Sequence, residues 1–130
     1  MKIVDKTGEW LEYRPGVEVQ PVVGATDGSP VGVSRVRVVA GAWLTPEDGE
    51  RHPEVETLFV HRGTLRVERA GSWEDAVAPA IVHVAANEWH KVRAGDGGAE
   101  LVVVASPDWE ATNRCTELGD DGLAEGRGTR

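Results

Sequence analysis

The sequence is poor in cysteine, since Cys115 is the single one among 130 residues. One thiol cannot form a disulfide within the chain, and it cannot build a zinc site that needs several thiolates. Basic residues are also scarce, with 14 Lys and Arg against 22 Asp and Glu, which gives a formal net charge of −8. A groove for DNA or RNA needs clustered basic side chains. We therefore expect no nucleic acid partner.

Long apolar runs are missing as well. No run approaches the roughly 18 residues that a membrane-spanning helix needs. The opening residues 1–5 carry a single lysine and no apolar stretch, so they lack the pattern of a secretory signal peptide. We expect no membrane partner and a cytoplasmic protein.

Sustained helical periodicity is absent, and short valine-rich runs alternate with turn signals instead. A length of 130 residues suits one domain. We predict a single all-β domain over residues 1–110, which includes an N-terminal strand segment, followed by a polar, flexible tail over 111–130. Strands are predicted at residues 9–13, 17–23, 33–40, 57–61, 64–69, 73–77, 80–85, 90–93 and 100–105. Turns are predicted at residues 26–30, 46–49, 62–63, 70–72 and 95–98.

One stretch combines acidic residues and histidine with a period of two. Glu50, His52 and Glu56 are separated by even numbers, so they share one face of an extended strand, and Leu58 and Val60 continue that face into the core. Carboxylates and imidazoles are costly to bury unless something satisfies them. A metal ion would do so.

This stretch resembles the first motif of the cupins, which has two histidines one residue apart, then a glutamate, then a glycine after six more residues. Here six residues separate Glu56 from Gly63, and His52 stands at the second histidine position. Glu50 occupies the first histidine position, which departs from the family.

Residues 85–90 resemble the second cupin motif, in which a histidine follows three residues after a Pro-x-Gly turn. His90 stands at the histidine position, and Asn87 replaces the glycine as the residue that best tolerates a positive φ. The resemblance covers roughly residues 17–107. Residues 10–19 also look like the opening of the ChrR-like and acetylacetone dioxygenase groups of cupins.

The resemblance implies a double-stranded β-helix, or jelly-roll, barrel with one divalent metal ion in its mouth. Carried over, the metal ligands are Glu50, His52, Glu56 and His90. Two imidazoles with one or two carboxylates suit Fe(II), Mn(II), Ni(II) or Zn(II). Glu50 is either a fourth ligand, a catalytic acid–base residue beside the metal, or a solvated turn residue. The alternative for the whole set is a cupin barrel that is filled by side chains and holds no metal.

Other polar and aromatic residues have less certain roles from sequence alone. Strand alternation places His61 and His83 on the outer face or at a subunit contact. Trp89 either packs or walls the pocket. Arg35 and Arg37 either face solvent or line the mouth and bind an anionic substrate.

The function that this resemblance implies is a metal-dependent enzyme for a small molecule that carries a carbonyl or enolate. Dioxygenase-like cleavage and cyclisation or isomerisation in a biosynthetic pathway both fit. The alternative is a metal- or ligand-binding sensor without turnover, because this fold hosts many activities. We also expect a homodimer, since open sheet edges invite pairing, with residues 3–13 as a contributor to the interface.

Overall fold

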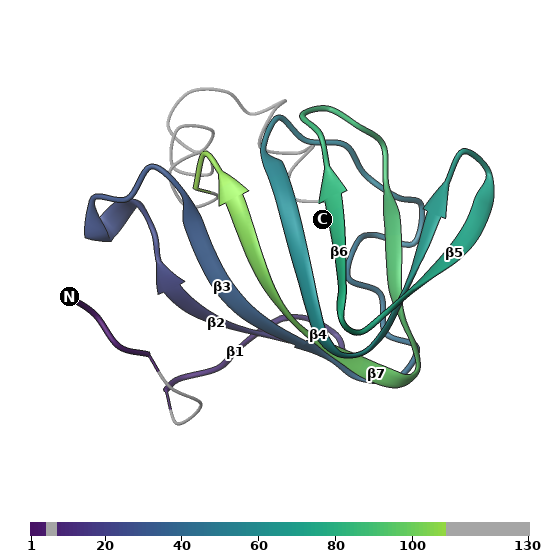
Figure 1. Ribbon diagram of the computed structural model, residues 1–130, viewed down its shortest axis with the longest axis horizontal. Coiled ribbons are helices and arrows are strands. Elements are labelled where there is room, and N and C mark those ends of the chain that lie inside the picture. Colours follow the sequence, from purple (N-terminus) through teal and green to yellow (C-terminus); the bar gives the residue numbers. More distant parts are fainter. Residues whose placement is uncertain (5–7, 109–130) are drawn as a thin grey trace.

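The computed structural model describes residues 1–4 and 8–108. Seven strands and one short 3-10 helix make up this part of the chain (Figure 1). They are β1 (Leu11–Arg14), β2 (Val17–Val23), η1 (Ala25–Asp27), β3 (Gly32–Val38), β4 (Val55–Arg69), β5 (Ser72–Val77), β6 (Ala80–Val84) and β7 (Lys91–Ser106). The predicted all-β class is confirmed. No helix in the described ranges is long and apolar enough to cross a membrane.

The strands form one antiparallel sheet in the order β1-β2-β3-β7-β4-β5, and β6 also pairs with β4. The first half of β4 pairs with β6 and the second half with β5, so the sheet bends where these partners change. Figure 1 shows β5 diverging from β6 at this bend. The arrangement agrees with the predicted jelly-roll barrel, whose two layers face each other across an interior.

Two predicted turns, at residues 62–63 and 95–98, are wrong. β4 and β7 each continue through these residues as one long strand. Gly63 pairs with Ala99 and Leu65 pairs with Ala94, so residues 95–98 form an insertion opposite Thr64. Glycine-rich sequences that are typical of turns also occur at β-bulges, which bend a strand without reversing its direction.

The core lies on the inner face of the sheet. Leu58 and Val60 are buried, whereas the side chain of Phe59 between them is 40% exposed, which confirms the predicted period of two along β4. The buried cluster comprises Val17, Val36, Val38, Leu58, Val60, Leu65, Val92, Ala94, Ala99 and Leu101. This apolar interior holds the polar cluster described below.

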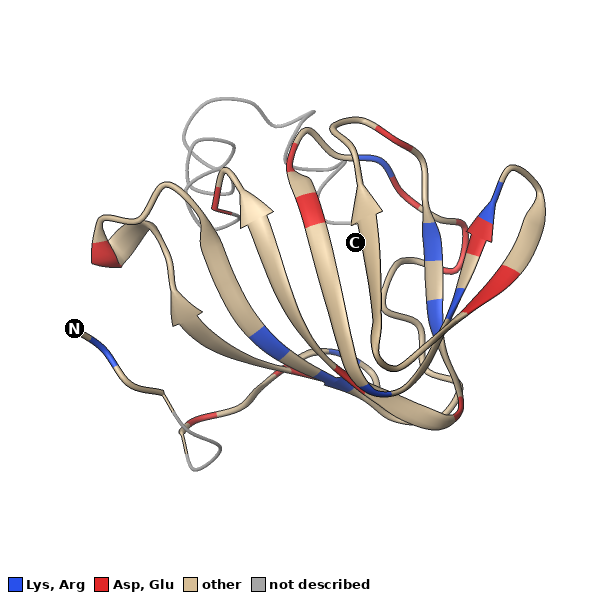
Figure 2. Cartoon of the chain, in the orientation of Figure 1, with Lys and Arg blue, Asp and Glu red and all other residues tan. Residues whose placement is uncertain are grey.

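Arg35 and Arg37 alternate along β3 with Val36 and Val38, which are buried, so the two arginines lie on the outer face. Figure 2 shows the basic positions of β3 in blue. Arg37 Nε donates to Glu18 Oε1 at 2.7 Å, and Arg35 Nη1 donates to Gln20 Oε1 at 3.1 Å. Both guanidinium groups also stack on the ring of Trp10, at 4.0 and 5.4 Å from its centre. They therefore do not line the interior, which excludes the anion-binding role left open for them.

The predicted tail over residues 111–130, which contains Cys115, lies outside the described residues. The homodimer and the cytoplasmic location stay predictions.

Candidate metal centre

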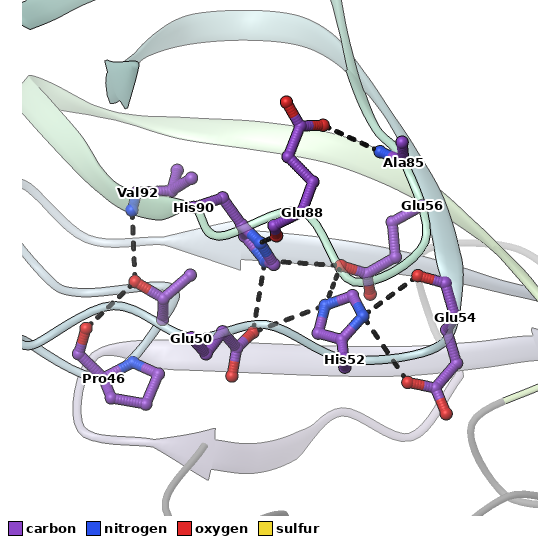
Figure 3. Close-up of polar contacts among 10 residues, drawn as sticks. Pro46, Glu50, His52, Glu54, Glu56, Ala85, Glu88, His90 and Val92 are labelled. Carbon is purple, nitrogen blue, oxygen red and sulfur yellow. Dashed lines mark hydrogen bonds and ion pairs between the residues drawn. The ribbon is translucent and has the colours of Figure 1, made fainter. Parts of the chain in front are cut away.

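Four side chains from three segments meet in the interior: Glu50, His52, Glu56 and His90 (Figure 3). Glu50 and His52 lie in the segment before β4, which bends at residues 53–54 and does not continue the strand as predicted. Glu56 lies in β4, and His90 directly precedes β7. Backbone hydrogen bonds run both ways between Glu50 and His90, at 2.9 and 2.8 Å. The chain thus brings together all four residues that the sequence singled out.

The donor atoms of these side chains converge. His52 Nε2 lies 3.0 Å from Glu56 Oε1 and 3.6 Å from Glu50 Oε2. His90 Nε2 lies 3.4 Å from Glu50 Oε2 and 4.0 Å from Glu56 Oε1. One donor atom from each of Glu50, His52 and His90 fits within 4.8 Å of the others. His52 and His90 are 2% and 6% exposed, so the cluster is shielded from bulk water.

Both imidazole rings are oriented by backbone carbonyls. His52 Nδ1 lies 3.0 Å from the carbonyl oxygen of Glu54, and His90 Nδ1 lies 2.9 Å from that of Glu88. A carbonyl accepts only, so each Nδ1 carries the hydrogen and donates it. Each Nε2 therefore faces the carboxylates. Metal-binding histidines in proteins are fixed in this way.

The donor set fits a divalent transition metal. Ions bound at about 2.0–2.2 Å hold neighbouring ligand atoms roughly 3.0–3.5 Å apart, close to the separations seen between the Nε2 atoms and the carboxylates. Two imidazoles and two carboxylates suit iron, manganese, nickel or zinc.

Glu54 is a member of this neighbourhood that the sequence reading missed. Its side chain is fully buried, and Oε1 lies 3.5 Å from His52 Nδ1, on the ring edge opposite Glu50 and Glu56 (Figure 3). A carboxylate behind a ligating histidine makes the ring a better ligand and holds its orientation. The sequence did carry a sign of this position, because Glu54 lies two residues from both His52 and Glu56 and so shares their alternation.

The turn before His90 confirms the inference about Asn87. Asn87 has a φ of 61°, the left-handed conformation that the glycine of the motif would take. Its N–H donates to the carbonyl of His52 at 2.7 Å, and Glu88 Oε1 accepts from Ala85 N at 2.9 Å. This turn fixes His90 against the segment that carries His52.

The remaining histidines lie away from the cluster, and Trp89 does not line the cavity described below. His61 and His83 are exposed, and His83 Nδ1 contacts Thr57 Oγ1 at 3.0 Å on the outer face, as strand alternation predicts. The ring of Trp89 covers Gly49, where an added Cβ would clash with it. Trp89 is therefore a packing residue, which was one of its two expected roles.

A cavity of about 230 Å³ opens beside the cluster. Glu50, Glu56 and His90 form part of its wall. Most of the rest is apolar and comes from Val19, Val36, Leu44, Leu58, Val92, Val103 and Ala105. Small-molecule sites have this composition, with a few polar groups set in an apolar pocket.

The electrostatics of the cluster favour a charged His90. Burial lowers the pKa of His90, but the hydrogen bond to Glu50, the carbonyl of Glu88 and the negative charges of Glu50 and Glu56 together outweigh it, so the pKa lies above its ordinary value. Protons and a metal ion would compete for the same Nε2 lone pair.

Metal affinity should therefore fall as the pH is lowered, and the fall should begin above the ordinary histidine pKa of about 6.5. The sign follows from the raised pKa, because the protonated form that cannot bind metal persists to a higher pH. Titration against a chelator of known affinity at several pH values measures this. The measured affinity is corrected for the pH dependence of the chelator's own metal affinity. A metal affinity that stays equal from about pH 8 to about pH 5 would contradict this prediction.

Comparison with known proteins gives a match in structure only. No family model matches the chain, and no curated protein matches its sequence. KdgF from Halomonas sp. superposes with a TM-score of 0.73 at 18% identity, over 86% of this chain and 97% of that one. The polyketide cyclase RemF from Streptomyces resistomycificus gives 0.70 at 20% identity, over 82% and 79%. An RmlC-like cupin from Shewanella frigidimarina gives 0.70 at 16% identity, over 85% and 94%. The chain therefore has the fold of the cupins.

Proposed function

We propose that this protein is a metal-dependent cupin enzyme that acts on a small molecule with a carbonyl or enolate group. The observation that carries the proposal is that two imidazoles and two carboxylates meet beside a largely apolar cavity, whose wall includes Glu50, Glu56 and His90. His52, Glu56 and His90 would hold one divalent ion, with Glu50 either as a fourth ligand or as an acid–base residue beside it. When bound, such an ion supplies a Lewis acid that polarises a carbonyl and stabilises negative charge on its oxygen.

The side chains around the ion have separable tasks in this proposal. His52 and His90 present Nε2 to the ion because their Nδ1 atoms are held by carbonyls. The apolar walls exclude water from the reacting carbons. Glu50 lines the cavity with a largely buried carboxylate, so it can move a proton to or from a bound substrate. Proton transfer next to a carbonyl is a step that cyclisation and isomerisation share.

The solved structures that resemble this chain support the proposal through the shared fold. The polyketide cyclase RemF shows that this architecture can carry a cyclisation, but one fold hosts many activities. The competing proposal is a sensor that binds metal and ligand without turnover. The metal centre and the cavity serve both, so only turnover separates them.

Deuterium exchange next to a carbonyl tests for turnover without knowledge of the substrate. Acetylacetone in D2O is followed by proton NMR with metal-loaded and metal-free protein. We expect the metal-loaded protein to accelerate the exchange. Glu50→Gln should reduce that acceleration roughly 100-fold or more, as for loss of a general base. Glu12→Gln, at an exposed position of β1, is the matched control and should have no effect.

The metal content of the Glu50→Gln protein decides between the two roles of this residue. Retained metal with lost exchange makes Glu50 an acid–base residue, whereas lost metal makes it a fourth ligand. Metal-loaded protein that binds acetylacetone without accelerating exchange would contradict the enzyme and favour the sensor.

A further inference from the structure

A serine interrupts the apolar wall of the cavity beside the candidate metal centre. Ser34 lies on the inner face of β3, two residues before the buried Val36 and opposite Val103 of β7. All three residues line the cavity. Neither cupin-like motif contains Ser34, and the proposed function so far gives it no task.

The hydroxyl of Ser34 opens onto this cavity. Within residues 1–4 and 8–108 it has no hydrogen-bond partner, and its oxygen is not fully enclosed by protein. Thr45 on the same wall differs, because its Oγ1 donates to the carbonyl oxygen of Pro46 and accepts from the N–H of Val92, both at 3.1 Å. A ligand that strips water from a hydroxyl without replacing the hydrogen bond loses free energy. Ser34 therefore favours ligands with a polar atom at this point.

The pairing of the strands gives the separation between Ser34 and the metal centre. Glu56 pairs with Ala105, which pairs with Gly32, and Ser34 is two residues further along β3. Neighbouring strands lie about 4.8 Å apart and successive residues about 3.4 Å, so the Cα atoms of Glu56 and Ser34 are roughly 12 Å apart along the sheet. Both side chains line the same cavity, so one small molecule can reach both of them.

The wall next to Gly32 is closed by Asp108, which closely follows β7 and is only 8% exposed. Its carboxylate accepts from the N–H of Ala25 at 2.8 Å. It also fills the space that side chains at positions 24 and 32 would take, since a Cβ on Gly24 or Gly32 would clash with it. A ligand held at the metal centre therefore extends along the row of residues that carries Ser34.

The size and the charges of the cavity limit the ligand further. Its volume is about 230 Å³. An apolar cavity of about 150 Å³ holds benzene, so roughly nine non-hydrogen atoms fit inside by proportion. Among the described residues that line it there is no Lys or Arg to pair with a distal phosphate or carboxylate. A serine hydroxyl, in contrast, can donate to or accept from a neutral oxygen.

We propose that Ser34 is a specificity-determining residue that hydrogen-bonds to a neutral oxygen of the substrate, across an apolar body from the metal-binding oxygens. This inference rests on the proposed function, because the other end of the substrate is held at the metal. The substrate class is then a compact carbonyl compound of roughly nine non-hydrogen atoms with a second hydroxyl or carbonyl group several bonds away. Compounds with a phosphate or carboxylate at that end are excluded.

Hydroxamic acids test this without the natural substrate, because the hydroxamate group binds metals strongly. Two straight-chain series, lengthened one methylene at a time, end in a hydroxyl or in a methyl group. Calorimetry measures their affinities for the zinc-loaded protein. In the wild type, the affinity of the hydroxyl compound relative to the methyl compound should peak at one chain length, at which the terminal hydroxyl reaches Ser34.

Ser34→Ala separates recognition by the hydroxyl from general effects. It should weaken binding of the hydroxyl compound at the peak length about three- to tenfold, the usual worth of a neutral hydrogen bond. The methyl compound of matching length should bind as before or more tightly, whereas a merely structural role of Ser34 would change both series alike. Ser72→Ala makes the same chemical change at an exposed position of β5 and should keep the peak. Zinc content and melting temperatures confirm that each variant is loaded and folded.

The outcomes distinguish the two proposals. If the wild type shows no peak at any length, or if Ser34→Ala keeps the peak or weakens both series equally, the role of Ser34 is overturned while the metal centre stands. If neither series binds to protein shown to contain zinc, the cavity is not a substrate site, and the proposed function fails together with this inference.

Discussion

Replacing His90 with alanine is expected to abolish metal retention. His90 comes from a different segment than His52 and Glu56, and it supplies one of only two imidazoles in the cluster among the described residues. Changes to residues that merely support a ligand typically cost 10–100-fold in affinity or activity. Removal of a ligand itself should cost at least about 100-fold. Metal stoichiometry by mass spectrometry, with affinities from chelator competition, measures the effect.

His83→Ala is the matched control for this experiment. His83 lies seven residues earlier on β6, is exposed, and contacts Thr57 on the outer face. It should keep the metal affinity of the wild type. If His90→Ala keeps full occupancy while His83→Ala loses it, the assignment of the cluster is wrong.

A second large effect is expected on stability. Gly63→Ala should lower the free energy of unfolding by about 2 to 5 kcal/mol, the sum of a left-handed backbone and a steric clash. Gly63 has a φ of 78°, and its added Cβ would clash with the carbonyl oxygen of Gly98 and lie 2.9 Å from the Cα of Ala99. Both contacts are backbone atoms of β7 at the bulge, so the sheet itself would have to shift.

Gly71→Ala isolates the backbone contribution. Gly71 has a φ of 80°, but nothing lies within 4 Å of the position where its Cβ would be. The Gly71→Ala substitution should lower the free energy of unfolding by only about 1 to 2 kcal/mol. Urea denaturation of both metal-free variants gives the two values. Equal losses would show that the β4–β7 bulge yields to a methyl group at no cost.

The parts of the fold and site that the sequence predicts are those governed by local periodicity. Even-numbered positions from His52 to Val60 are buried, as the alternation of an extended chain predicts, although only those from Glu56 on belong to β4. The same rule placed His83 outside. Asn87 was recognisable because few residues other than glycine adopt a positive φ.

The features that escaped prediction depend on contacts between distant segments. The continuity of β4 through Gly63 is decided by pairing with β7, which a local turn signal does not reveal. Asp108 enters the cavity only because Gly24 and Gly32, more than seventy residues earlier, leave room for its carboxylate. Glu54 was missed although its spacing of two residues from His52 and from Glu56 already predicts a buried position beside them.

Glu50, His52, Glu56 and His90 are expected to hold a metal ion, and the metal content of the folded protein measures whether they do. Protein purified without an affinity tag or metal resin is analysed by inductively coupled plasma mass spectrometry, before and after dialysis against iron, manganese, nickel or zinc. We expect about one divalent ion per chain, which is lost on chelation and regained on addition of metal. Folded protein that contains no metal and takes up none would contradict it, and would show that protonated imidazoles hold the carboxylates together instead.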